Sequence, residues 1–340
     1  MENELANKLS GASLMDDREL ILDRWITEVL SSSDFKRVPL AGDASFRRYY
    51  RILHKGKPYV VMDAPPPEVP KQFVDLAFAL DSHGLTVPKI LSQALEHGFL
   101  LLSDFGDRLY LHELNATTAD TLYKDAFQAL IHLQTCPVTT LPVFDRLFLQ
   151  RQLGIFEEWY LKTHNCIEVT DTLQRQLIEL YEPLFQTIEM QPFVFVHRDY
   201  HSRNLMILDN NNPGIIDFQD AMVGPITYDL VSLLQDCYIS WPRDRVSDWV
   251  AEYQSAAVKK DLLSSDITAQ EFLRWFDWTG LQRHLKNLGI FSRLYHRDNK
   301  SGYLKDIPLL LKYIQETCQR YPELAALEAF FATLPEKAVV

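Results

Sequence analysis

The sequence has few cysteines and glycines, and it has no long apolar run. Its 340 residues include only four cysteines and 12 glycines. The cysteines are widely spread and form no C-x-x-C pair, so we expect reduced thiols rather than a disulfide framework. No run of 18 apolar residues is present to span a membrane, and the acidic N-terminus does not resemble a secretory signal. These features predict a cytoplasmic protein without membrane partners.

Positive charge is also scarce. The chain has 34 Lys and Arg against 46 Asp and Glu, which gives a formal net charge of −12. Because such a protein repels a phosphate backbone, we do not expect a nucleic-acid partner. With 47% hydrophobic and 24% charged residues, the composition is that of an ordinary folded protein, and the length suits two domains or lobes.

The pattern of apolar residues divides the chain into a sheet-based part and a helical part. A first helix is predicted to begin near Asp16; its apolar residues at helical spacing are Leu20, Ile21, Trp25, Ile26 and Val29. Two hairpins are expected, one from 46–53 and 59–62 and one from 87–88 and 99–102. Later helices are predicted at 119–134, 148–162, 171–187, 249–257 and 271–288. We therefore expect an N-terminal helix and nucleotide-binding lobe in 1–103 and a helical lobe in 104–340.

One extended island, residues 193–220, interrupts the helical part and carries a group of polar residues. Two apolar strands flank the loop 197–204, which reads HRDYHSRN, and a later extended segment ends at Asp217. Phosphoryl transfer needs a carboxylate to accept or orient the acceptor hydroxyl, and oxygen ligands to hold Mg²⁺ against the nucleotide phosphates. The spacing H-x-D-x-x-x-x-N, followed by a strand that ends in Asp, supplies these groups.

We therefore interpret Asp199 as the catalytic base and Asn204 and Asp217 as the Mg²⁺ ligands. His197 belongs to the same catalytic set, as a residue that orients the loop. The alternative is a β-hairpin whose polar residues only cap and turn the chain. The first interpretation predicts an enzyme with ATP and Mg²⁺ as cofactors.

The same residues resemble a known family. The runs HRDYHSRN and IIDFQDAMVGPITYDL are similar to those of the aminoglycoside phosphotransferase and choline kinase group of the protein-kinase-like fold. The resemblance covers about residues 20–315 and implies an α+β, bilobal fold with a small antiparallel-sheet lobe and a mainly helical lobe. It also implies that Asp229, in the run G-P-x-x-Y-D-L, supports the catalytic loop; the alternative is a cap for the next helix. No A-P-E motif follows Asp217, so a small-molecule hydroxyl is the expected acceptor.

Three further runs narrow the resemblance. GDASFRRYYR, MDAPP and QRHLKNLGIF, which begin at residues 42, 62 and 282, are similar to those of the anomeric sugar kinases of bacterial cell-wall recycling. This resemblance implies ATP-dependent phosphorylation of the C1 hydroxyl of N-acetylmuramic acid and N-acetylglucosamine, with an amino sugar and a nucleotide as partners. Two alternatives stay open: a kinase for a cationic acceptor of the aminoglycoside or choline type, and a pseudokinase that only binds. The sequence does not predict the oligomeric state.

The chain departs from the kinase pattern on the nucleotide side. It has no G-x-G-x-x-G loop, and the segment 59–62 has no lysine of the V-A-I-K type. By resemblance, we expect Ser45 and Phe46 of the candidate loop to bind the nucleotide. We also expect Arg48 or Arg51 to replace the missing lysine at the phosphates. The alternative is that these arginines lie on a solvated edge strand.

A basic cluster stands out in this acidic chain. Its members are Arg283, Lys286, Arg293, Arg297 and Lys300. On a helix, the first four share one face, so they could attract nucleotide phosphates or the lactyl carboxylate of N-acetylmuramic acid. The alternative is a solvated face with acidic partners.

A few more residues are candidates for substrate contact. They are Arg283 and Lys286 of the basic cluster, Arg203 and Asp220, and the aromatic residues Trp275, Phe276 and Trp278. Asp220 has two alternatives, a second metal ligand or a turn cap. The aromatic residues either stack on a sugar ring or belong to the core.

Overall fold

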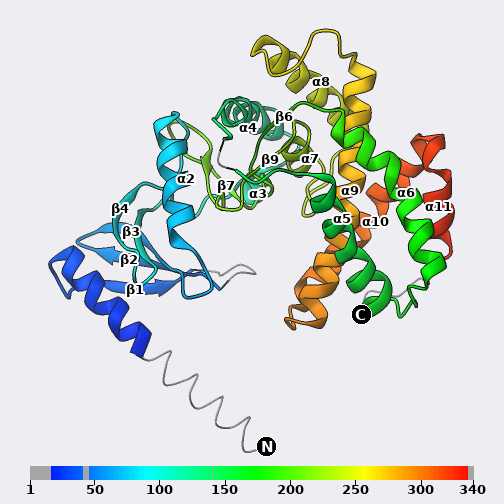
Figure 1. The fold of residues 1–340 in the computed structure, drawn as a ribbon. Coiled ribbons are helices and arrows are strands. Elements are labelled where there is room, and N and C mark those ends of the chain that lie inside the picture. The colour runs from blue at the N-terminus through cyan, green and yellow to red at the C-terminus, as the bar shows by residue number, and fades with distance from the viewer. Residues whose placement is uncertain (1–16, 41–45, 140, 336–340) are drawn as a thin grey trace, which may run out of the picture. The chain divides into compact units, whose positions relative to one another are not determined.

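The computed structural model describes residues 17–40, 46–139 and 141–335 of the chain (Figure 1). The chain divides into two compact units, Met1–Gly106 and Asp107–Val340. The first unit has a sheet with helices, and the second is mainly helical with two short β-ribbons. This confirms the α+β class with an antiparallel N-terminal sheet.

The N-terminal unit contains a five-stranded antiparallel sheet. Its strands are β1 Lys36–Pro39, β2 Arg48–His54, β3 Lys57–Asp63, β4 Ile90–Ala94 and β5 Phe99–Ser103, in the order β1-β2-β3-β5-β4. The two expected hairpins are present, because β2 pairs with β3 and β4 pairs with β5. Lys55 and Gly56 make the first turn, and both have a positive φ, which glycine adopts without steric cost. Since β2 pairs with strands on both sides, the prediction of an edge strand is wrong.

Two helices accompany this sheet, one at residues 17–30 and α2 at Pro70–Ser82. The first helix is confirmed, although Asp16, its expected start, lies outside the described residues. Its buried face agrees in part with the expected one: Ile26 is buried in the core of the sheet, and Trp25 and Val29 pack against that core. Leu20 and Ile21 are instead exposed, and the buried Leu22 was not predicted.

The C-terminal unit consists mainly of helices. They are α3 Tyr110–Glu113, α4 Ala119–Gln134, α5 Arg146–Ile155, the π-helix η1 Phe156–His164, α6 Asp171–Glu189, α7 Tyr228–Leu234, α8 Arg243–Lys259, α9 Ala269–His296, the 3₁₀-helix η2 Ser301–Asp306, α10 Ile307–Arg320, the 3₁₀-helix η3 Pro322–Leu324 and α11 Ala325–Ala332. All five predicted later helices are present, although the one at 148–162 is split between α5 and η1. Within the described residues, no helix has the length and apolarity needed to cross a lipid bilayer.

The central element of this unit is the 28-residue helix α9, which packs against η1, α5, α6, α7, α8 and α10. Thr268 caps its N-terminus and accepts a hydrogen bond from the Glu271 amide. Gly289 allows α9 to pass close to the junction of α5 and η1, because a Cβ at this position would lie 2.4 Å from the Ile155 carbonyl oxygen. As a result, α9 is buried on its polar side as well as on its apolar side.

Two short antiparallel ribbons interrupt the helices. One pairs β6 Phe193–Val196 with β9 Met222–Pro225, and the other pairs β7 Leu205–Met206 with β8 Gly214–Ile215. The sequence predicted β6, but the pairing partner β9 was missed, and the strands of the second ribbon are shorter than expected. Together the ribbons fix both ends of the loop 197–204 and the segment that ends at Asp217.

Candidate active site

The loop after β6 is held by a buried aspartate. The carboxylate of Asp229 accepts hydrogen bonds from the backbone amides of His197, at 2.6 Å, and Arg198, at 2.9 Å. Arg198 has a φ of +79°, a strained value that these bonds help to hold. Asp229 makes no cap bond to α7, whose N-cap residue is Thr227, so the alternative of a helix cap is wrong. Asp229 therefore supports the loop through its backbone.

The same loop brings together Asp199, Asn204 and Asp217. The side-chain amide of Asn204 donates to the Asp199 carbonyl oxygen at 2.9 Å and to the Asp217 carboxylate at 3.2 Å. Asp217 has a φ of +66°, and its other carboxylate oxygen accepts from Gln219 Nε2 at 2.6 Å. A β-hairpin that only turns the chain would not need Asn204 to bond both the Asp199 backbone and the Asp217 carboxylate.

The donors at this position fit a magnesium ion. Asp217 offers carboxylate oxygens and Asn204 an amide oxygen, which are the hard ligands that Mg²⁺ prefers. Among the described residues, no cluster of three or more His, Cys, Asp or Glu side chains is suited to hold a metal. A small set of protein ligands suits Mg²⁺ at a kinase site, because phosphates and water complete its coordination.

The charges around Asp199 keep its carboxylate ionised. Its side chain is 43% exposed, and Arg283 Nη2 lies 3.8 Å from its Oδ1. Burial alone would raise the pKa of Asp199, but the positive charges of Lys286, His201 and Arg283 outweigh burial and lower it. Asp199 is therefore an anion at neutral pH, with its charge directed toward α9.

His197 and Asp229 are fully buried. Burial lowers the pKa of His197 to about 4, so its imidazole is neutral at physiological pH. Its Nε2 lies 3.0 Å from the Ile216 carbonyl oxygen, a contact that links the loop to the segment before Asp217. Burial also raises the pKa of Asp229 to about 7, against the effect of its two backbone hydrogen bonds.

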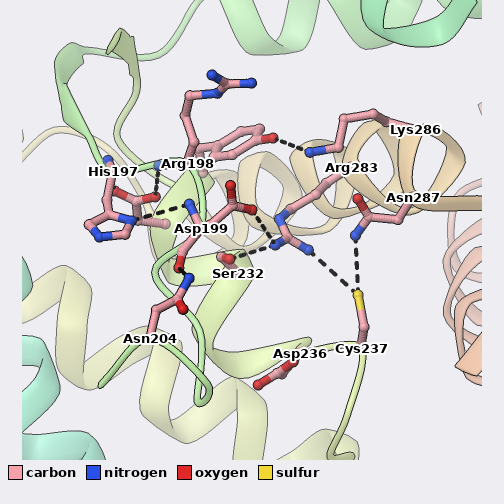
Figure 2. A network of polar contacts seen from close by, with 12 residues as sticks. His197, Arg198, Asp199, Asn204, Ser232, Asp236, Cys237, Arg283, Lys286 and Asn287 are labelled. Carbon is pink, nitrogen blue, oxygen red and sulfur yellow. Dashed lines mark hydrogen bonds and ion pairs between the residues drawn. The ribbon is translucent and has the colours of Figure 1, made fainter. Parts of the chain in front are cut away.

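Two members of the predicted basic cluster lie beside the loop (Figure 2). Arg283 is only 2% exposed and Lys286 only 4%. Arg283 Nη2 donates to Ser232 Oγ at 2.7 Å, and Lys286 Nζ donates to the Tyr228 hydroxyl at 3.0 Å. The alternative of a solvated face is therefore wrong for these two residues. It is correct for Arg297, which is exposed and pairs with Asp298.

The other predicted substrate residues have contacts within the protein. The guanidinium of Arg203 lies 3.6 Å from the centre of the Tyr238 ring. Asp220 is exposed, and its carbonyl oxygen accepts from Arg198 Nη1 at 3.2 Å. The aromatic residues of α9 are buried, so the prediction of sugar stacking is wrong and the core alternative holds. Their exposed fractions are 4% for Trp275, 0% for Phe276 and 1% for Trp278.

The predicted nucleotide residues of the N-terminal unit have partners within that unit. Arg48 pairs with Asp63 at 2.5 Å, and Arg18 pairs with the other oxygen of the same carboxylate at 2.6 Å. Arg51 pairs with Asp104 at 2.5 Å. Phe46 is exposed, and Ser45 lies outside the described residues.

Several polar neighbours of the loop were not predicted. Asp236 is buried and accepts from both the amide and the hydroxyl of Ser202, which fixes the later part of the loop. Cys237 accepts from Asn287 Nδ2 at 3.1 Å and from Arg283 Nη1 at 3.8 Å. The available signal was an acid and a cysteine, Asp236 and Cys237, two residues after the mostly apolar run 230–234.

Comparisons with known proteins show the family of this chain. The family model described as the phosphotransferase enzyme family matches residues 36–275. The N-acetylmuramate/N-acetylglucosamine kinase of Pseudomonas aeruginosa is 43% identical over 303 residues, which cover 88% of this chain and 89% of that protein. The kinase of the same name from Neisseria meningitidis is 37% identical over 326 residues, which cover 93% of this chain and 96% of that protein.

Solved structures share the fold. An ADP-bound aminoglycoside phosphotransferase is similar with a TM-score of 0.58 and 18% identity, and the match covers 88% of this chain and 98% of that one. An ethanolamine kinase of Plasmodium vivax is similar with a TM-score of 0.61 and 12% identity, over 86% and 84% of the two chains. The chain therefore belongs to the phosphotransferase enzyme family, as its loop and the run after Asp217 predicted.

Proposed function

We propose that this protein transfers the γ-phosphoryl group of ATP to the anomeric C1 hydroxyl of N-acetylmuramate and N-acetylglucosamine. The observation that carries the proposal is the pair of hydrogen bonds by which the Asn204 side chain links the Asp199 backbone to the Asp217 carboxylate. The names of the relatives supply the acceptor class, because these proteins are similar to this chain over about nine-tenths of its length. We place the reaction in the cytoplasm, where ATP is available, and in the recycling of cell-wall sugars.

In this proposal Asp199 orients the C1 hydroxyl and accepts its proton. An ionised carboxylate that is 43% exposed is able to reach a substrate hydroxyl. His197 and Asp229 act on the loop only, because both are buried and bonded to its backbone or to the neighbouring segment. Positioning and electrostatic stabilisation then supply most of the rate, as in other phosphoryl transfers.

Asn204 and Asp217 would hold the magnesium ion, which neutralises charge on the phosphates when it is bound. For the missing lysine, the ion pairs of the N-terminal unit favour Arg48 over Arg51. Arg48 and Arg18 share the single carboxylate of Asp63, so these three side chains together have a net charge of one positive unit. The pair of Arg51 and its partner carboxylate is neutral.

The proposal is tested by incubating the enzyme with Mg²⁺, ATP and each amino sugar. Phosphorus-31 NMR of the product resolves an anomeric phosphate from a C6 phosphate. We expect only the anomeric product and no turnover of an aminoglycoside or of choline. A C6 product would contradict the regiochemistry, and turnover of the cationic acceptors alone would favour the alternative kinase. Consumption of no ATP with any acceptor would favour the pseudokinase.

A further inference from the structure

We propose that Lys286 binds the carboxylate of an anionic acceptor sugar and so makes the enzyme favour N-acetylmuramate over N-acetylglucosamine. This inference rests on the proposed function, because it takes these two sugars as acceptors. They differ by one lactyl ether group, which carries a single carboxylate. A protein that distinguishes them by charge needs a cation near the acceptor that no protein carboxylate neutralises.

Lys286 comes nearest to that need: its charge lowers the pKa of Asp199, but no carboxylate of the described residues lies within ion-pair distance of its ammonium group. It is 4% exposed, and its ammonium group has three N–H donors. Its hydrogen bond goes to the neutral hydroxyl of Tyr228, at 3.0 Å. Within the described part of the chain, Lys286 forms no ion pair and no second hydrogen bond. Two donors of this ammonium are therefore not used by the described residues.

Such an arrangement is costly for folding. A buried charge without a partner loses its hydration, and an apolar side chain of similar volume usually stabilises a protein more. The position of Lys286 on a helix buried on all sides would suit methionine or leucine equally well. The ammonium is thus better explained by a ligand than by the fold.

Arg283, one turn earlier on α9, differs in this respect. Its terminal nitrogens contact Ser232, Cys237 and Asp199, so the guanidinium is fixed by the protein. A fixed guanidinium beside Asp199 orients that carboxylate and keeps it ionised. We therefore assign Arg283 to positioning and Lys286 to the substrate.

The location of Lys286 also fits the acceptor. Figure 2 shows Asp199 between Asn204 on one side and Arg283 with Lys286 on the other. Because Asn204 belongs to the proposed metal and nucleotide side, the acceptor approaches Asp199 from the side of α9. A sugar whose C1 hydroxyl reaches Asp199 then has its ring substituents near Lys286.

The experiment compares wild type with Lys286→Met on N-acetylmuramate, on its methyl ester and on N-acetylglucosamine. We expect the ratio of kcat/KM for N-acetylmuramate to that for N-acetylglucosamine to fall roughly tenfold to hundredfold, mainly through KM. In wild type, the ester should lose a similar factor against the free acid. In the variant, the free acid and the ester should be nearly equal substrates.

Two further variants sharpen the test. Tyr228→Phe removes the hydroxyl that orients Lys286, and we expect a smaller loss of the same preference. Arg297→Gln changes an exposed cation of the same helix region that pairs with Asp298, and we expect no change of preference. The melting temperature of Lys286→Met should equal or exceed that of wild type, which separates a binding defect from misfolding.

Two outcomes would overturn the inference. The first is an equal loss of kcat/KM for the two sugars, since Lys286 would then act on a step that both share. The second is an unchanged preference in Lys286→Met. A wild-type enzyme that phosphorylates neither sugar would instead refute the proposed function itself, so the two failures are distinguishable.

Discussion

Two cations, Arg51 of the N-terminal unit and Lys286 of the C-terminal unit, have different partners. In the N-terminal unit, Arg51 is neutralised by Asp104, and the pair is further tied to the Gly106 carbonyl oxygen. On α9 of the C-terminal unit, Lys286 is more deeply buried but contacts only the Tyr228 hydroxyl. The difference teaches that burial does not by itself reveal the role of a cation. Arg51 is bound to a carboxylate of its own unit, whereas the ammonium of Lys286 has no carboxylate of the described residues within ion-pair distance.

The strongest test of this comparison removes the carboxylate toward which the cations of α9 point. Asp199→Asn keeps the shape of the side chain but loses its charge and its ability to accept a proton. We expect kcat to fall about 10²- to 10⁴-fold, with an unchanged melting temperature. Steady-state kinetics with N-acetylglucosamine measures the loss, and Asp209→Asn, which changes an exposed aspartate outside the candidate site, serves as the control. Near-normal turnover in Asp199→Asn would refute the catalytic role.

The second test separates the two arginines of β2. Arg51→Ala leaves the buried Asp104 without its cation, so we expect the free energy of unfolding to fall by about 2–4 kcal/mol. Arg48→Ala should cost less stability, because Asp63 keeps its pair with Arg18. Because Arg48 is the proposed contact of the ATP phosphates, we expect Arg48→Ala to raise the KM for ATP roughly tenfold.

Urea unfolding and ATP titrations of the two variants measure these effects. If the KM for ATP is unchanged in Arg48→Ala, another residue contacts the phosphates. If Arg51→Ala instead raises that KM without loss of stability, the roles of the two arginines are reversed.

A pH series tests the buried support of the loop. The pKa of Asp229 rises from 3.8 to about 7 on folding, so between these values the folded protein binds more protons than the unfolded chain. Its contribution to stability is therefore complete below about pH 4 and is lost as the pH rises toward 7. We expect the difference in unfolding free energy between wild type and Asp229→Asn to shrink over this range. Differences that stay constant with pH would contradict the raised pKa.

The smallest expected effect concerns Cys237, whose sulfur accepts hydrogen bonds from Arg283 and Asn287 of α9. Cys237→Ala removes an acceptor from Arg283 and Asn287, so we expect kcat/KM to fall about twofold to fivefold. Cys237→Ser keeps an acceptor and should stay within about twofold of wild type. A larger loss in the serine variant than in the alanine variant would show that the bonds to sulfur are unimportant.

Local patterns predicted much of the fold. The helix at 119–134 was predicted with the bounds of α4, and the first strand of the extended island has those of β6. The helix is long and the strand is apolar, so in each case the residues of the element itself determine its secondary structure. The strand β9 was missed because its pairing with β6 brings together residues nearly 30 positions apart, and its own four residues carry little signal.

The candidate site was predictable in its motif but not in its surroundings. The spacing of Asp199, Asn204 and Asp217 is a local feature, so the sequence shows it. The burial of Arg283 and Lys286 is not local, because helical periodicity cannot distinguish a polar face in water from a polar face covered by another helix. The ion pair of Arg48 could not be predicted either, because its partner Asp63 lies on the other strand of the hairpin and also binds Arg18.

The close approach at Gly289 has a consequence for how acceptor preference can change. Gly289 lies about one turn after Lys286 on α9. Its close approach to the Ile155 backbone fixes the position of α9 along the helix axis. Side chains at 286 and 287 can then be exchanged without moving the helix that carries them. If Lys286 binds the acceptor as proposed, selection or design for a new sugar can change the charge at this position through single substitutions, with the position of α9 set by the close approach at Gly289.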